Sequence, residues 1–207
     1  MNTRLILMGT RLFFGGLVWA AVVYQAWALH NMGTLNPINY FSYFTILSNV
    51  FAATIFFIST WYLFSSRKPT RSDDLIRGAS VLYMLITGVV YTLLLRNYEV
   101  STDLAWVNSV LHYIMPAVVV LDWLYQPQLN KLSFKQAWVW LVFPLFYLVY
   151  SLIRGPIAHW YPYPFLNPAQ VGGYGGVALY CLAILVGFVV CGWLLMQAGN
   201  KLRRHVL

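Results

Sequence analysis

The chain has 207 residues, of which 60% are hydrophobic and 9% are charged. An ordinary soluble domain carries roughly 25% charged residues, so this sequence has too few polar groups to cover a water-facing surface. The formal net charge is +8, but the basic residues lie between apolar runs and do not form a nucleic-acid-binding patch. The composition therefore excludes a soluble globule and indicates an integral membrane protein.

Six apolar stretches are long enough to cross a bilayer core of about 30 Å, which takes roughly 20 helical residues. They predict an all-α fold, a polytopic membrane protein whose six transmembrane helices form one bundle and a single domain over residues 1–207. The runs are too long and continuous for the strands of an outer-membrane barrel. Pro144 in the fifth span predicts a kink. The predicted spans are residues 5–29, 40–64, 79–95, 106–125, 138–153 and 176–198.

The basic residues alternate between the two sides of the predicted bundle. Every second connection holds several of them, and the other connections hold only Arg96 and Arg154. Since cytoplasmic loops carry an excess of Lys and Arg, the pattern predicts that both termini are cytoplasmic. A cleaved signal peptide is the alternative for residues 5–29, but that run is long and contains Arg11. The residues predicted on the cytoplasmic side are Arg4, Arg67, Lys68, Arg71, Arg77, Lys131, Lys135, Lys201, Arg203 and Arg204.

Two connections have a distinctive composition. Residues 65–77 are rich in Ser, Arg and Asp and are predicted to form a cytoplasmic loop. Residues 155–175 alternate prolines with Trp160, Tyr163 and other aromatic residues, a composition that predicts a non-helical segment. Aromatic residues at the outer headgroups favour an interfacial belt, and the alternative is a lid over a cavity that opens outward.

Thr45 and His112 are polar residues inside predicted membrane spans. Hydrocarbon offers them no hydration, so each is a candidate functional residue. Spans two and four both run from outside to inside, and these residues lie about five and six residues after the starts of their spans. At 1.5 Å per residue, both side chains lie roughly 8–9 Å below the outer boundary. This matching depth allows the two side chains to meet.

Neighbouring polar residues extend each position into a stripe. Ser48 and Asn49 share the helix face of Thr45, and Asn108 shares the face of His112. Packed together, the stripes form a polar pocket between spans two and four, in which an imidazole can activate a hydroxyl as a nucleophile. The two asparagines are candidates for orienting the imidazole or stabilising an oxyanion. The structural alternative is hydrogen bonding of these side chains within or between helices.

Three charged residues complete the set of candidates. Arg11 and Asp122 lie at compatible depths in spans one and four, which allows a buried ion pair. Arg154 closes span five near the plane of Thr45 and His112, so it either holds a substrate carboxylate or extends to lipid headgroups. His, Cys and carboxylate side chains do not cluster in the sequence, so we expect neither a metal nor a cofactor.

Several short motifs, with the six spans, resemble the androgen-induced-gene family of membrane threonine hydrolases. This family includes the androgen-dependent regulator of tissue-factor-pathway inhibitor, and its bacterial six-span branch is most similar. Its animal members are described as cleaving fatty acid esters of hydroxy fatty acids with a Thr nucleophile and a His, which match Thr45 and His112. The resemblance implies a bacterial inner-membrane location. The motifs are residues 42–49 (SYFTILSN), Asn-x-x-x-His-x-x-x-Pro at 108–116, Asp122-Trp123 and Tyr161-Pro162-Tyr163-Pro164.

The expected function is therefore that of an intramembrane lipid ester hydrolase, in which Thr45 attacks the ester carbonyl and His112 is the general base. The expected partners are membrane lipids and a lipid ester substrate, and not nucleic acid. The alternative is a non-catalytic membrane carrier or lipid-binding scaffold that uses the same polar pocket. The residues expected to bind or orient the substrate are Ser48, Asn49, Asn108 and Arg154.

Overall fold

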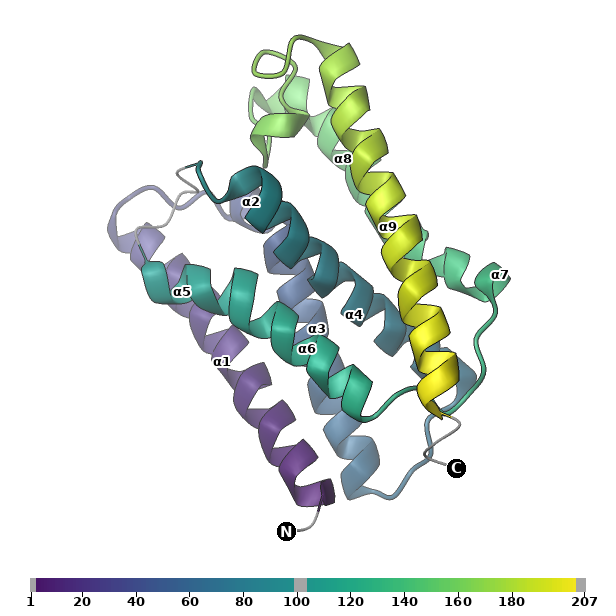
Figure 1. Cartoon of the computed structure of the whole chain (residues 1–207). Coiled ribbons are helices and arrows are strands. Elements are labelled where there is room, and N and C mark those ends of the chain that lie inside the picture. Colours follow the sequence, from purple (N-terminus) through teal and green to yellow (C-terminus); the bar gives the residue numbers. More distant parts are fainter. Residues whose placement is uncertain (1–2, 99–103, 204–207) are drawn as a thin grey trace.

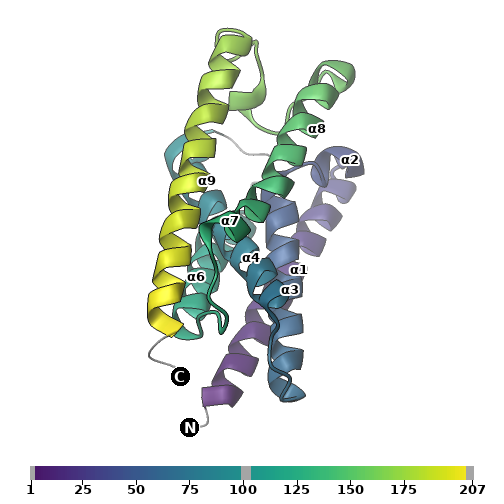
Figure 2. The ribbon, with the colours of Figure 1, turned by 90° about the vertical axis from the view of Figure 1, so that its right-hand side faces the viewer.

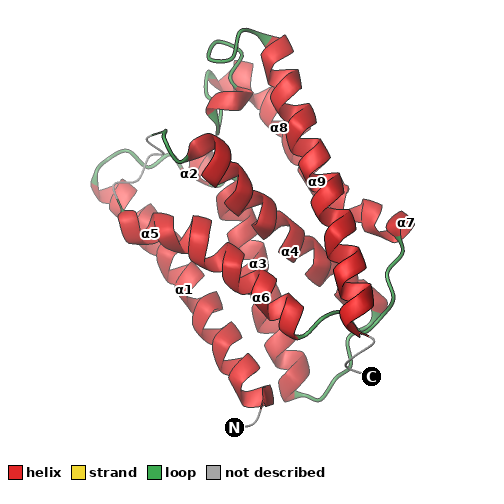
Figure 3. Cartoon of the chain, in the orientation of Figure 1, coloured by secondary structure: helices red, strands yellow, loops and turns green. Residues whose placement is uncertain are grey.

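The computed structural model describes residues 3–98 and 104–203, and within these residues all regular structure is helical (Figure 3). Several long helices are interrupted by short π-helical or 3₁₀-helical turns. The α-helices are α1 (Thr3–Asn31), α2 (Pro37–Tyr40), α3 (Phe44–Phe64), α4 (Arg71–Val90), α5 (Ala105–Ser109), α6 (Met115–Tyr125), α7 (Phe134–Ala137), α8 (Val142–Ala158) and α9 (Tyr174–Leu202). The π-helical turns are η1 (Tyr91–Leu95) and η2 (Val110–Ile114), and the 3₁₀ turns are η3 (Trp138–Leu141) and η4 (Pro164–Leu166).

Among the residues that the structure describes, six helical stretches are long and apolar enough to cross a membrane, which confirms the predicted number of spans and the all-α class. α1 begins and α9 ends at the same end of the bundle (Figure 1). The architecture is therefore that of a multi-pass membrane protein. The spans are Thr3–Asn31, Phe44–Phe64, Arg71–Leu95, Ala105–Tyr125, Phe134–Ala158 and Tyr174–Leu202.

Helix α4 is at the centre of the bundle. It packs against α3, α6 and α9, and α1 packs along α3. Helices α8 and α9 diverge toward the end at which the segment between them joins them (Figure 2). These two spans are the least buried within the protein. Since lipid tails are as apolar as leucine, the exposed aliphatic side chains of these two helices are compatible with a lipid-facing surface.

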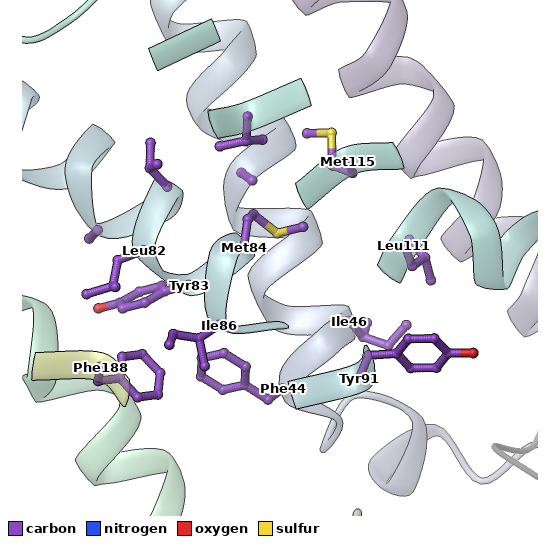
Figure 4. Close-up of a cluster of buried hydrophobic side chains, with 14 of the residues drawn as sticks. Phe44, Ile46, Leu82, Tyr83, Met84, Ile86, Tyr91, Leu111, Met115 and Phe188 are labelled. Carbon is purple, nitrogen blue, oxygen red and sulfur yellow. The ribbon is translucent and has the colours of Figure 1, made fainter. Parts of the chain in front are cut away.

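The core surrounds α4 (Figure 4). At the start of α3, the Phe44 ring meets the rings of Tyr83 and Phe188 at centroid distances of 6.0 and 6.2 Å. Figure 4 shows Ile46 and Tyr91 on the side of this cluster nearer to Leu111. These contacts hold the first turn of α3 in place relative to α4 and α9.

The start of span two differs from its prediction. The prediction began this span at Tyr40, but Tyr40 ends the separate short helix α2, and α3 begins at Phe44. The Asn36 side chain caps α2, because it accepts a hydrogen bond from the Asn39 N–H at 3.1 Å. A capping asparagine followed by proline starts its own helical turn. Thr45 therefore lies in the first turn of α3 and not deeper in the helix.

The segment 65–77, predicted as a loop, is helical in its second half. Helix α4 begins at Arg71, well before the predicted start of span three. The Asp73 N–H donates to Thr70 Oγ1 at 3.3 Å, and the Thr70 N–H donates to the Asp73 carboxylate at 2.8 Å. This reciprocal pair is a capping box, so the polar residues that indicated a loop in fact begin the helix.

The kink predicted at Pro144 takes the form of the 3₁₀ turn η3 just before α8. Proline has no N–H to donate to the carbonyl four residues earlier, which is that of Trp140. The Tyr83 hydroxyl of α4 donates to this carbonyl instead, at 2.9 Å. Span three thus compensates for the hydrogen bond that span five loses.

The segment 155–175 differs from its prediction in two ways. It begins as helix, because α8 continues to Ala158 and ends where His159 adopts a left-handed conformation with φ 50°. Further on, Tyr163 and Phe165 are buried in the protein. Burial of Tyr163 and Phe165, which line a cavity, agrees with the alternative, a segment that covers a cavity. Trp160 and Tyr161 are only partly buried, so an interfacial position of these two rings stays a prediction.

The predicted ion pair between Arg11 and Asp122 is confirmed. Arg11 donates from Nε to Asp122 Oδ1 at 2.8 Å and from Nη2 to Oδ2 at 3.1 Å. Arg77 of α4 donates to the same carboxylate at 2.8 Å. Arg11 is only 1% exposed. The pair therefore joins α1, α4 and α6 inside the bundle, as expected for a structural role.

Candidate active site

The structure brings Thr45 and His112 into contact, which the sequence allowed. The residue counts behind the expected equal depth do not hold, because Thr45 is the second residue of α3 and His112 is the eighth residue of its span. Thr45 Oγ1 lies 3.3 Å from His112 Nε2. Thr45 lies in the first turn of α3, and His112 is in the π-helical turn η2 of span four. Both residues are buried, with exposed fractions of 7% and 8%. A hydroxyl and an imidazole thus meet in an interior from which bulk water is largely excluded.

The hydrogen bonds of the imidazole define its tautomer. His112 Nδ1 lies 3.2 Å from the main-chain carbonyl oxygen of Asn108. A carbonyl can only accept, so Nδ1 carries the proton and donates it. The unprotonated Nε2 then faces the Thr45 hydroxyl, which is the arrangement that a general base requires. Asn108 therefore orients His112 through its main-chain carbonyl, whereas the prediction assigned this role to its side chain.

The Asn108 side chain reaches the imidazole indirectly. Its Nδ2 donates to the Tyr91 hydroxyl at 2.6 Å. The Tyr91 ring stacks on the His112 ring, with centroids 4.0 Å apart. Tyr91 begins the π-helical turn η1, and His112 lies in η2, so the two π-turns of the described residues meet at the candidate site. Such turns occur frequently at functional sites.

Asn49 has a different role from the one expected of it. In η2 the Met115 N–H bonds to Val110 O, in an i to i−5 register. In the same register the partner of Leu111 O would be the N–H of residue 116. Residue 116 is a proline and has no N–H, so this hydrogen bond is missing. Asn49 Nδ2 supplies the missing donor, at 3.0 Å from Leu111 O. Asn49 therefore fastens α3 to the turn that holds His112, and it does not contact the imidazole.

Ser48 also forms a link between helices. Its hydroxyl donates to the Thr45 carbonyl at 3.2 Å and lies 3.0 Å from Thr87 Oγ1 of α4. Ser48 is fully buried. Its contacts therefore agree with the structural alternative for this stripe, while Thr45 and His112 retain the arrangement expected of a reacting pair.

Sequence reasoning did not identify Tyr163 as part of the site. Its hydroxyl accepts a hydrogen bond from the Thr45 N–H at 3.1 Å and lies 3.3 Å from Thr45 Oγ1. Tyr163 is distant from Thr45 in the sequence, in the segment between α8 and α9. Burial raises the pKa of Tyr163 to about 12, so the phenol keeps its proton at neutral pH. The signals for it in the sequence were the alternation of aromatic residues with prolines and the Tyr161-Pro162-Tyr163-Pro164 motif.

Thr45 lies between two spaces of different character. On one side is a cavity of about 380 Å³, walled by aliphatic and aromatic side chains of α3, α4, α8, α9 and η4, among them Leu148, Leu185 and Phe188. This volume is within the range of small-molecule pockets. On the other side, next to His112, is a hollow of about 30 Å³. That space is large enough for one water molecule.

Arg154 does not join the site. Its Nη2 donates to Asn39 Oδ1 at 2.6 Å, and its guanidinium lies 5.3 Å from the centre of the Trp160 ring. These contacts hold the end of α8 to α2 and do not direct the charge toward Thr45, which does not support a role in holding a substrate carboxylate. The extension of Arg154 to lipid headgroups stays a prediction. Within residues 3–98 and 104–203, no group of three or more His, Cys, Asp or Glu could hold a metal ion.

No family model matches the chain, and comparisons with curated proteins and with solved structures give no match. The function is therefore inferred from the residues of the site and their geometry.

Proposed function

We propose that the protein is an intramembrane lipid ester hydrolase with Thr45 as the nucleophile and His112 as the general base. One observation carries this proposal. Thr45 Oγ1 lies 3.3 Å from His112 Nε2, while Nδ1 of the same ring donates to the Asn108 carbonyl. A hydroxyl beside a base that a third group orients is the general arrangement of nucleophilic acyl transfer.

In the proposed reaction, Thr45 Oγ1 attacks the ester carbonyl carbon while its proton passes to His112 Nε2. The carbonyl π electrons move to the oxygen and give a tetrahedral oxyanion. This charge develops near the N-terminus of α3, where the positive end of the helix dipole favours it. Collapse of the intermediate expels the alcohol, which takes the proton from His112, and leaves an acyl group on Thr45.

Deacylation repeats these steps with water. A water molecule in the 30 Å³ hollow beside His112 would lie next to the acyl-Thr45 carbonyl. His112 removes a proton from the water as it attacks, and Thr45 leaves with that proton when the carboxylic acid is released. In this proposal the nucleophilic water occupies the hollow beside His112 and the substrate chain occupies the larger cavity, and Thr45 lines both spaces.

The apolar walls of the larger cavity support a lipid as the substrate. A charged group would lose its hydration there without compensating hydrogen bonds, so this cavity fits the alkyl chains of a lipid ester, and a free carboxylate on the substrate would have to stay outside it. The resemblance to membrane threonine hydrolases makes fatty acid esters of hydroxy fatty acids the first substrates to test. The same resemblance and the charge pattern favour a bacterial inner membrane with both termini in the cytoplasm, which reporter fusions to each terminus would test.

The test compares hydrolysis of such an ester by purified wild type, Thr45→Ala and His112→Ala in detergent. Wild type should hydrolyse it, Thr45→Ala should fall to background, and His112→Ala should lose about 100-fold or more. Matched controls are Thr54→Ala, whose exposed hydroxyl bonds to Val50 O of its own helix, and the exposed His30→Ala. Binding of the lipid without hydrolysis by wild type would contradict the proposal and favour a carrier or scaffold.

A further inference from the structure

The Tyr163 hydroxyl has two contacts with one residue, the proposed nucleophile. Its oxygen accepts from the Thr45 N–H at 3.1 Å and lies 3.3 Å from Thr45 Oγ1. Of the side chains described above, only Tyr163 and His112 place a polar atom within hydrogen-bonding distance of that hydroxyl. A phenol in this position can contact the atoms that change bonding when Thr45 attacks an ester.

The Tyr163 ring is held firmly enough to position its hydroxyl. It stacks on Phe165 with a centroid distance of 5.2 Å and an interplanar angle of 8°. It also meets the edge of Tyr43 at 5.8 Å. Prolines 162 and 164 flank the residue and restrict the backbone on both sides. The side chain is 7% exposed, so solvent does not compete strongly for its hydroxyl.

The direction of the hydrogen bonds determines what the phenol can do. Thr45 lies in the first turn of α3, where main-chain N–H groups have no acceptor within the helix. This N–H donates to the Tyr163 oxygen, so the proton of the phenol remains available for a second hydrogen bond. A hydroxyl that accepts from an amide becomes a better donor, because hydrogen bonds in a chain polarise one another.

We infer, on the basis of the proposed hydrolase function, that Tyr163 is a third catalytic residue, which donates a hydrogen bond to the substrate carbonyl oxygen as it becomes an oxyanion. When the bond between Thr45 Oγ1 and the carbonyl carbon forms, the carbonyl oxygen is brought next to Oγ1 and so within reach of the phenol. The carbonyl π pair moves to that oxygen, and the Thr45 proton goes to His112. Tyr163 keeps its proton throughout and stabilises the charge by hydrogen bonding alone.

The test is a steady-state comparison of wild type, Tyr163→Phe and Thr45→Ala on a fatty acid ester of a hydroxy fatty acid and on a p-nitrophenyl fatty ester. Tyr163→Phe keeps the stacked ring and removes only the hydroxyl. Loss of one oxyanion donor should lower kcat by about 100-fold, with KM nearly unchanged. Tyr161→Phe is the matched control, since it makes the same chemical change in the same segment, at a hydroxyl that interacts with Tyr174.

A second readout separates a catalytic role from a structural one. A trifluoromethyl ketone with a fatty alkyl chain forms an oxyanion when a nucleophilic hydroxyl adds to it, whereas the matching methyl ketone remains largely a carbonyl. Tyr163→Phe should weaken inhibition by the trifluoromethyl ketone by about the same factor as it lowers kcat/KM. Inhibition by the methyl ketone should change little. Equal weakening of both inhibitors would mean that Tyr163 only shapes the pocket, and would overturn the inference.

The remaining outcomes distinguish this inference from the proposed function. If wild type hydrolyses either ester and Tyr163→Phe has the same kcat as Tyr161→Phe, Tyr163 is not catalytic and the proposed hydrolase stands. If Tyr163→Phe is faster than wild type, the hydroxyl obstructs the site, which also overturns the inference. If wild type hydrolyses neither ester, the proposed function fails, and the inference fails with it.

Discussion

The Tyr91 ring stacks on the His112 imidazole, with centroids 4.0 Å apart and an angle of 22° between the planes. Each residue lies in a π-helical turn, one in span three and one in span four. A π-helical turn shifts the side chains that follow it relative to a regular helix. The stacked pair therefore fixes the plane of the imidazole, while the Asn108 carbonyl fixes its rotation within that plane.

Substitutions at Tyr91 should separate the effect of stacking from that of hydrogen bonding. Tyr91→Phe keeps the stacked ring and loses the bond from Asn108 Nδ2, so we expect a fall in kcat of only a few-fold. Tyr91→Leu removes the ring, leaves the imidazole free to tilt, and should lower kcat about 10-fold or more. Steady-state rates of both variants provide the measurement. A larger loss in Tyr91→Phe than in Tyr91→Leu would contradict the stacking role.

Asn49→Leu should destabilise the protein and impair catalysis together. The substitution leaves Leu111 O without the donor that Pro116 cannot supply, and a buried unsatisfied carbonyl costs about 1–3 kcal/mol. Because Leu111 precedes His112 in η2, the imidazole should also shift relative to Thr45. Thermal unfolding and initial rates, measured on the same sample, would show both effects. Unchanged unfolding in Asn49→Leu would contradict this account, with Thr54→Ala as the control.

Asp122→Ala should destabilise the bundle without changing the chemistry of the site. It leaves Arg11 and Arg77 without their shared carboxylate, and removal of one partner from a buried pair costs about 3–5 kcal/mol. Asp122 lies ten residues from His112 along span four, roughly 15 Å, so kcat per folded molecule should be retained. Unfolding in denaturant and active-site titration would test this, with the exposed Lys135→Gln as the control for loss of a surface charge.

The contribution of Tyr163 should be independent of pH well into the alkaline range. An ordinary tyrosine loses half of its protons at about pH 10, so half of the molecules can no longer donate a hydrogen bond there. Burial disfavours the phenolate and raises the pKa of Tyr163 to about 12, so the proton is retained to higher pH. The ratio of wild-type to Tyr163→Phe rates should therefore stay constant from about pH 8 to about pH 10. A ratio that has fallen to about half of its neutral value by about pH 10 would contradict the assignment.

The sequence predicted the six spans and allowed the contact between Thr45 and His112, for physical reasons that do not require knowledge of the fold. Apolar length determines which segments can cross a bilayer. Depth in the bilayer then determines which polar residues can meet. The same reasoning paired Arg11 with Asp122, and the structure has that ion pair. Reasoning from depth showed that these contacts were possible without knowledge of how the helices pack.

The sequence did not predict features that depend on local competition or on long-range contacts. The Asn36 side chain caps the separate helix α2, so the expected span two is not one continuous helix. Thr45 therefore lies in the first turn of α3. Asn49 donates to Leu111 O because the hydrogen-bond register of the π-turn η2 pairs this carbonyl with a proline, which has no N–H. Tyr163 meets Thr45 across 118 residues of chain, and no helical periodicity encodes that contact.

The acyl-enzyme intermediate provides the most direct test of Thr45 as the nucleophile. Wild type is mixed with an activated fatty ester, quenched in acid within the first turnovers, digested, and analysed by tandem mass spectrometry. The account predicts an acyl group on Thr45 in wild type, at a higher level in a variant slow to deacylate, and none in Thr45→Ala. Ester turnover without acylation of Thr45, or with the acyl group on Ser48, would contradict it.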